Sequence, residues 1–363
     1  RLLGGPLHVS PSMKYLSRAN TRYLALAAIA IVIAWYLSSV SSHSGLTRTL
    51  KQWQPKPNYP AIVAFNRDGS RLAISNRVSK DIRIYATPSF ELLRTFGKPG
   101  EVQAIAFAPN GKTLAVGSGF SRQIDGRNSI RLWDTDTGEV VWEPPGFLAG
   151  TGAENDVLAL AFAPEGKELL ASLHSVHAQE SCCYLYLIDL QTKTTKGFAS
   201  SLSYSVAYSA NGDRIVSGGF GGARMWSKSG EGPVWEHSVK RGNQPNNFGV
   251  VNMVSISPDG SELLNSSEGT VTIHSALDGK QVGVLSIERK GKSENLLATY
   301  SPDGRYILAA SDRLFIFDAR SKALLEESEL PKRAISVSFD SRGRMFAIGT
   351  NSTLFLDIGS TFT

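Results

Sequence analysis

The chain has 363 residues, of which 42% are apolar and 19% charged, and its formal net charge is +6. This composition is typical of a globular protein and excludes a disordered or collagen-like chain. The two cysteines, Cys182 and Cys183, are adjacent, which excludes a small domain held together by several disulfides. Apolar residues are not concentrated in stretches with the 3.6-residue period of a helix, so a helical bundle is not expected.

Residues 23–40 form an uncharged run that is long enough to cross a bilayer as a helix. Aromatic rings at its far end favour a membrane interface. We therefore predict a transmembrane helix or signal anchor over 23–40; its anchoring residues are Tyr23, Leu24, Ile29, Ile31, Ile33, Trp35 and Tyr36. A cleaved secretory signal and a buried core helix are the two alternatives.

One pattern recurs along the rest of the chain: an apolar strand, a polar turn with glycine, then a second strand. The turns are NRDG (66–69), APNG (108–111), APEG (163–166), SANG (209–212), SPDG (257–260), SPDG (301–304) and DSRG (340–343). Their glycines follow one another at intervals of 39 to 55 residues. A glycine at this place supplies the positive φ angle that a tight hairpin needs.

A third strand follows in every unit, and a fourth follows in six of them, as in GEVVWE (138–143). Seven four-stranded units of this period predict an all-β, seven-bladed β-propeller. The segment RLWDTDTGEVV (131–141) resembles a WD repeat, and SPDG turns are frequent in that family. The resemblance extends over 46–363, although Trp133-Asp134 is the only Trp-Asp pair and the Gly-His signature is absent.

The last unit lacks a fourth strand, and residues 46–53 resemble the start of the segment 91–107. We expect this N-terminal strand to pair with the last blade and close the ring, which removes two exposed sheet edges. The predicted organisation is a basic, acid-poor segment (1–22), the membrane helix (23–40), a linker with the ring-closing strand (41–59) and the propeller (60–363). Whether residues 1–12, which precede Met13, are native is left open.

The first strands of the units, which line the channel of a propeller, carry almost no titratable groups. Their acids, Glu101, Asp156 and Asp340, lie at strand ends. No nucleophile elbow, zinc-protease motif, phosphate loop or paired CxxC is present. We therefore expect no catalytic residue, no metal and no cofactor, and no enzymatic activity.

The segment LHSVHAQESCC contains four potential soft metal ligands, His174, His177, Cys182 and Cys183. Adjacent side chains of an extended strand point to opposite faces, so both cysteines would not reach one metal without a bulge. A metal or redox site is the alternative to a polar loop that leads into a strand with one buried cysteine. A disulfide between the two cysteines is not expected, because it would close a strained ring.

Insertions at 117–129 and 174–182 and long blade connections at 144–155 and 239–249 map to one face of the predicted ring. Such loops often carry the function of a repeat protein. The same face is basic, and we predict that it binds an acidic protein surface or anionic headgroups. Its candidate residues are Lys98, Arg122, Arg127, Lys240, Arg241, Arg289, Lys290, Lys292, Lys332 and Arg333. Ordinary solvated loop charge is the alternative.

The resulting hypothesis is a non-catalytic, single-pass membrane protein that serves as an interaction scaffold or accessory subunit of a larger membrane complex. Its partners would be protein subunits and the membrane, with neither nucleic acid nor a small-molecule substrate. The N-terminus would lie inside and the propeller on the far side of a bacterial inner membrane, or of an organelle inner membrane. The alternatives are a secreted or periplasmic ligand-binding or sensing propeller released by signal cleavage, and a propeller enzyme of the lactonase or quinoprotein type.

Overall fold

The structure is a computed structural model. It describes residues 50–53, 61–76, 81–97, 101–119, 130–144, 155–175, 183–228, 232–239, 249–267, 269–285, 287, 296–343, 345–350 and 354–357. A boundary between two units of the chain falls between Thr47 and Arg48, and only the second unit contains described residues. All the statements below concern this second unit.

Each blade is one antiparallel sheet, and in blades 1 to 6 the strands follow the chain from the channel outwards. Blade 1 contains β2 (Ala61–Phe65), β3 (Arg71–Asn76), β4 (Ile82–Ala86) and β5 (Leu92–Phe96). Blade 2 contains β6 (Glu101–Phe107), β7 (Thr113–Gly119), β8 (Ile130–Asp134) and β9 (Val140–Trp142). Blade 3 contains β10 (Asn155–Phe162), β11 (Glu168–Ser175), β12 (Cys183–Asp189) and β13 (Thr195–Ala199).

The second half of the ring repeats this order. Blade 4 contains β14 (Ser203–Tyr208), β15 (Arg214–Gly219), β16 (Gly222–Ser227) and β17 (Pro233–Ser238). Blade 5 contains β18 (Val251–Ile256), β19 (Glu262–Ser267), β20 (Thr270–Ser275) and β21 (Gln281–Leu285). Blade 6 contains β22 (Leu297–Tyr300), β23 (Tyr306–Ala310), β24 (Arg313–Asp318) and β25 (Leu324–Glu329). Blade 7 contains β26 (Ala334–Phe339), β27 (Phe346–Thr350), β28 (Leu354–Asp357) and β1 (Leu50–Trp53).

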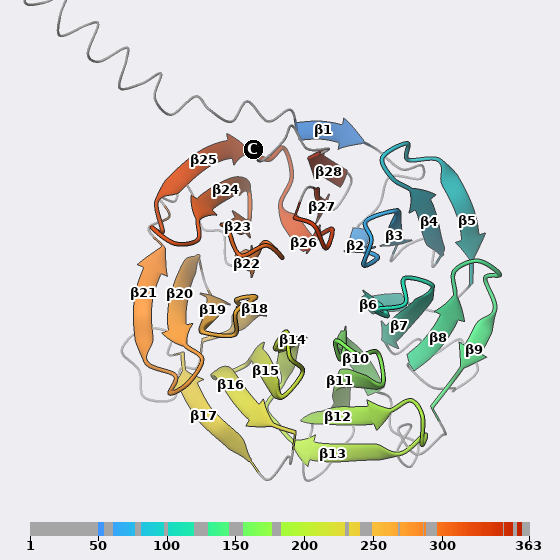
Figure 1. Ribbon diagram of the computed structural model, residues 1–363, viewed down its shortest axis with the longest axis horizontal. Coiled ribbons are helices and arrows are strands. Elements are labelled where there is room, and N and C mark those ends of the chain that lie inside the picture. Colours follow the sequence, from blue (N-terminus) through green and yellow to red (C-terminus); the bar gives the residue numbers. More distant parts are fainter. Residues whose placement is uncertain are drawn as a thin grey trace, which may run out of the picture. The chain divides into compact units, whose positions relative to one another are not determined.

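The described strands thus form seven four-stranded sheets arranged around an axis (Figure 1). The strand from the start of the chain, β1, lies beside the strand from its end, β28, with Leu50 opposite Asp357 and Trp53 opposite Leu354. The outer strand of blade 7 therefore comes from the opposite end of the described chain. This pairing joins the two ends of the ring and covers the edge that β28 would otherwise expose.

The hydrophobic core lies between the blades. The described residues contain seven apolar clusters, and each joins side chains of two neighbouring blades. Large side chains with no exposed surface include Leu72 in blade 1, Leu114 in blade 2 and Ile307 in blade 6. Because every blade packs against two others in this way, the ring is stabilised as a whole rather than blade by blade.

The turns between the first and second strands have the geometry that the glycine pattern predicts. The φ angles of their glycines are +72° at Gly69, Gly111, Gly212 and Gly304, +74° at Gly166 and Gly260, and +64° at Gly343. In each turn the glycine N–H donates to the carbonyl three residues earlier, as from Gly69 to Asn66. The prediction of seven tight glycine turns is confirmed.

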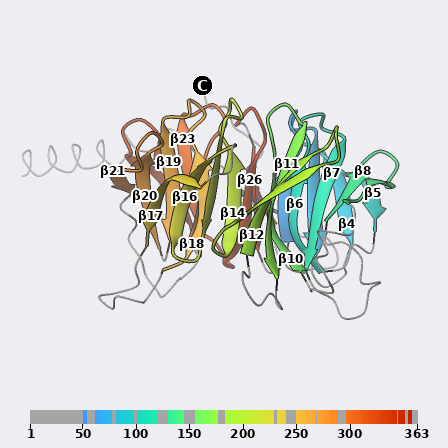
Figure 2. The same cartoon turned by 90° about the horizontal axis from the view of Figure 1, so that it is seen from below.

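These turns define one face of the ring, which we call the hairpin face; it also carries the turns between the third and fourth strands. We call the opposite face, with the connections between second and third strands and between blades, the loop face. The strands run from one face to the other (Figure 2).

The predicted fold class has to be corrected, because it placed a transmembrane helix ahead of the propeller. Every regular element of the described residues is a strand, and none of them belongs to a helix that is long and apolar enough to cross a membrane. The predicted segment 23–40, with Tyr23, Leu24, Ile29, Ile31, Ile33, Trp35 and Tyr36, lies outside the described residues.

Candidate functional site

Two of the ten cations predicted on the loop face are described, Lys332 and Arg333. They lie in the connection between β25 and β26, and both are exposed. Neither makes an ion pair with another residue of the described ranges. The other eight fall outside the described residues: Lys98, Arg122, Arg127, Lys240, Arg241, Arg289, Lys290 and Lys292.

The three acids expected at strand ends have separate environments. Glu101 begins β6, and Asp156 is the second residue of β10. The Oδ2 atom of Asp156 lies 4.0 Å from Nδ1 of His174. Asp340 is 2% exposed and accepts a hydrogen bond from the Met345 N–H at 2.8 Å, so its carboxylate fixes a turn. These acids do not converge on one point of the channel.

The segment with histidines and cysteines is described in part. His174 on β11 lies opposite Cys183 on β12 in the strand register, whereas His177 and Cys182 are outside the described residues. Within the described part of the chain, no group of three or more histidine, cysteine, aspartate or glutamate side chains could hold a metal ion. Cys183 is buried and disulfide-bonded, so the expectation of no disulfide is wrong.

Sequence reasoning missed a cavity of about 380 Å³ on the hairpin face. Aromatic residues from the ends of the first strands form its wall, namely Phe65, Phe107, Phe162 and Phe339. Its rim is the second residue of several hairpin turns: Arg67, Pro109, Pro164, Ala210 and Ser341. Comparing the second residues of the seven turns would have singled out Arg67, because it is the only charged residue at this position.

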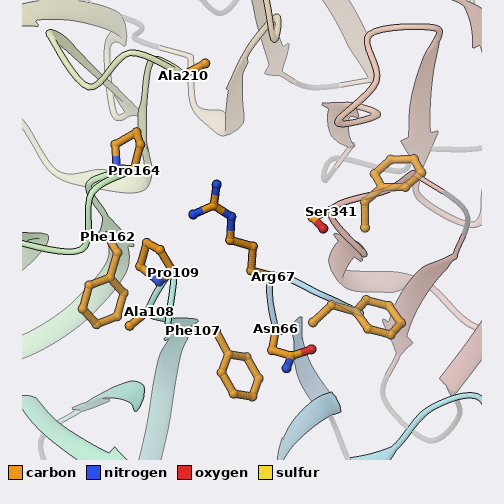
Figure 3. A pocket seen from close by; sticks show the side chains of 11 residues that line it. Asn66, Arg67, Phe107, Ala108, Pro109, Phe162, Pro164, Ala210 and Ser341 are labelled. Atoms are coloured by element: carbon orange, nitrogen blue, oxygen red, sulfur yellow. The ribbon is translucent and has the colours of Figure 1, made fainter. Parts of the chain in front are cut away.

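The Arg67 side chain reaches into the middle of this cavity, between Pro109 and Pro164 on one side and Ser341 on the other (Figure 3). It is exposed and makes no hydrogen bond or ion pair with another described residue. The carboxylate of the neighbouring Asp68 already has partners, since it accepts hydrogen bonds from the Ser70 N–H at 2.9 Å and from the Ser70 hydroxyl at 2.5 Å. The Ser70 hydroxyl lowers the pKa of the Asp68 carboxyl. The cavity therefore presents one available cation inside an apolar wall.

Two further contacts tie neighbouring blades together at the hairpin face. Glu262 of blade 5 accepts a hydrogen bond from the Tyr300 hydroxyl at 2.6 Å and forms an ion pair with Lys322 at 2.6 Å. Glu168 of blade 3 forms an ion pair with Lys228 of blade 4 at 2.8 Å. These contacts join blade 5 to blade 6 and blade 3 to blade 4.

Residues 90–134 match the family model described as WD domain, G-beta repeat. The match covers Trp133-Asp134 and the strands from the end of blade 1 through most of blade 2. Together with the propeller architecture, it supports a WD-repeat β-propeller.

The related proteins resemble only part of this chain. "Eukaryotic translation initiation factor 3 subunit I" of Aspergillus terreus is 38% identical over 114 residues, which is 30% of this chain and 28% of that protein. The subunit of the same name in Emericella nidulans is 33% identical over 112 residues, with the same shares. "Periodic tryptophan protein 2 homolog" of Schizosaccharomyces pombe is 29% identical over 115 residues, 31% of this chain and 12% of that protein. The chain thus spans about a quarter or less of the relatives it matches.

The prediction of a single-pass membrane protein, with the propeller beyond a bacterial or organelle inner membrane, is wrong. The relatives are a subunit of a translation initiation factor and a periodic tryptophan protein, not components of a membrane assembly by name. No helix of the described ranges is suited to cross a membrane.

Proposed function

We propose that this protein is a non-catalytic interaction scaffold that holds an acidic surface of a partner protein against its loop face. The observation that carries the proposal is the pair Lys332 and Arg333, which are exposed and without an ion pair among the described residues. Two adjacent cations attract a negatively charged surface and raise the rate of encounter.

The sequence supports a larger basic surface than these two residues. The eight other candidate cations lie in loops that the chain order assigns to the same face. A closed ring also suits a scaffold, because its interblade core fixes the strands from which the loops start.

The names of the relatives point in the same direction. A subunit of a translation initiation factor is by name part of a larger assembly. We extend this to the present chain as part of the proposal: it would be a protein-binding subunit, and its partners would be other proteins.

The test is a double charge reversal, Lys332→Glu with Arg333→Glu, in a tagged full-length chain expressed in its native cells. The matched control reverses two exposed cations of the hairpin face, Lys167→Glu with Arg320→Glu. Complexes are purified at low salt after nuclease treatment and compared by size and composition. We expect stoichiometric protein partners with the wild type and the control, and their loss with the loop-face variant.

Three results would contradict the proposal. They are a wild-type chain that purifies alone, equal retention of partners by both double variants, and an association that nuclease abolishes. The last result would identify a nucleic acid as the species on the basic face.

A further inference from the structure

The turns of the hairpin face pack against one another around the ring. At six turns a Cβ atom on the glycine would lie within 4 Å of the turn of the preceding blade; these pairs are Gly69–Asp340, Gly111–Asn66, Gly166–Pro109, Gly212–Pro164, Gly304–Pro258 and Gly343–Asp303. Gly260 of blade 5 differs, because no described atom lies within 4 Å of its Cβ position. The ring of turns is therefore open between blades 4 and 5.

The turn residue that precedes this opening differs from the prolines found at three of the closed contacts. In blades 2, 3, 5 and 6 the second turn residue is a proline, and Pro109, Pro164 and Pro258 would each contact a Cβ atom placed on the next glycine. Blade 4 has Ala210 at this place, and its smaller side chain does not reach Gly260. A second cavity of about 380 Å³ occupies the space between the two turns.

Ala210 belongs to the lining of both cavities, the one around Arg67 and the one beside Gly260. Figure 3 shows it at the edge of the axial cavity. The two cavities therefore adjoin at Ala210, and we refer to the pair, from the axis to the space between blades 4 and 5, as the groove. Its outer end includes Leu277, which is 74% exposed.

The charged side chains along this groove differ in whether they already have hydrogen-bond partners in the fold. At the outer end, Asp259 accepts hydrogen bonds from the Ser257 hydroxyl at 2.6 Å and the Ser261 hydroxyl at 2.8 Å. The Arg214 guanidinium donates to the Ala276 carbonyl at 2.8 Å. These groups are engaged in the fold, and Arg67 at the axial end is left to meet a ligand. An occupant therefore has to supply an anion at the axis and apolar groups along the wall.

We propose that this groove binds an extended peptide segment of a partner protein, with an acidic side chain of the peptide on Arg67 and apolar side chains next to it. A short groove with one charged anchor and an apolar wall suits a linear segment, which presents alternate side chains to opposite sides. The site lies on the hairpin face, so it is independent of the loop-face function proposed above.

The probe is a phage library of random linear peptides of 12 residues, selected on the full-length chain. We expect enrichment of peptides with an acidic residue beside leucine, isoleucine or phenylalanine. One selected peptide is then synthesised with its acidic residue and with the corresponding amide, and both dissociation constants are measured by fluorescence polarisation. A charge-assisted hydrogen bond predicts roughly tenfold to hundredfold weaker binding of the amide peptide.

Two variants test the two ends of the groove. Arg67→Leu removes the cation and is expected to weaken the acidic peptide by the same roughly tenfold to hundredfold factor. Ala210→Pro restores the proline of the other blades and should close the passage, with at least a tenfold loss. It should fold, because the N–H that closes this turn is that of Gly212, which donates to the Ser209 carbonyl. Pro302→Ala makes the reverse exchange in blade 6, outside the groove lining, and should leave the dissociation constant unchanged.

The proposal is overturned if the selection enriches no peptide, or peptides without an acidic residue. It is also overturned if the Arg67→Leu and Ala210→Pro variants bind the selected peptide as the wild type does. Finally, the loop-face variant with Lys332→Glu and Arg333→Glu should bind this peptide normally. If this loop-face variant lost binding, the peptide would bind the loop face, and the proposal that it binds the groove would be wrong.

Discussion

Tyr208 and Tyr300 end the first strands of blades 4 and 6 and differ in one hydrogen bond. The Tyr300 hydroxyl donates to Glu262 at 2.6 Å, and the Tyr300 residue is 6% exposed. The Tyr208 hydroxyl is buried and has no hydrogen-bond partner in the described part of the chain. Burial raises the pKa of both hydroxyls, and the nearby Glu168 adds to the effect at Tyr208. The same substitution, tyrosine to phenylalanine, should therefore reduce the stability at Tyr300 but not at Tyr208.

The magnitudes follow from what each hydroxyl loses. A hydrogen bond to a charged group contributes about 1.5–3 kcal/mol. Since Glu262 keeps its ion pair with Lys322 and part of its exposure to water, we expect Tyr300→Phe to cost about 1.5 kcal/mol, the low end of this range. Tyr208→Phe removes a buried polar group without a described partner, and we expect an effect between neutrality and a gain of about 1 kcal/mol.

The assay is urea unfolding of the full-length chain, with the transition midpoints compared at equal slope. Glu262→Gln is combined with Tyr300→Phe in a double-mutant cycle, because the two changes should not be additive if the hydroxyl acts through this carboxylate. A loss of stability with Tyr208→Phe equal to that with Tyr300→Phe would refute the assignment. Additive effects in the cycle would refute it as well.

Three further predictions concern the ring. Burial lowers the pKa of His274 and of His237, whose ring centroids are 4.1 Å apart. The folded state therefore favours neutral histidines, so the free energy of unfolding should fall as the pH drops below about 6.5. The fall should be less steep in the His237→Gln variant, and a free energy of unfolding that does not change with pH would contradict this. Gly69→Ala should reduce the stability more than Gly260→Ala, because a Cβ atom on Gly69 would lie 2.9 Å from the Cβ of Asp340. At Gly260 only the positive φ angle opposes the substitution, at a cost of about 1–2 kcal/mol. Equal losses of stability in thermal unfolding would contradict this. Deletion of residues 48–53 removes β1, so light scattering should detect self-association through the exposed edge of β28, and a monodisperse variant would contradict this.

The repeated turns could be found in the sequence because they depend on local chemistry. Each contains a glycine with a positive φ angle, and each is flanked by apolar runs, so neighbouring residues decide the hairpin. The pairing of residues near the start and end of the chain could also be inferred, because the last unit lacks one strand. The prediction of a membrane helix ahead of the propeller is not supported, because every regular element of the described residues is a strand.

The sequence predicted the two candidate sites to different degrees. Lys332 and Arg333 were placed on a blade connection by counting strands, and the structure has them there, exposed. Arg67 was not singled out, since one arginine in a polar turn is unremarkable until the other turns surround it. Its importance arises from turns of other blades that supply Pro109, Pro164 and Ser341.

The sequence by itself determined where strands and tight turns occur, because hydrophobic alternation and glycine conformation act over a few residues. Only the tertiary structure decided which turns meet across the axis, where Arg67 lies, and that the smaller Ala210 leaves a groove beside Gly260. The physical reason is that packing joins residues far apart in the chain, and a space between two turns depends on the volumes of both.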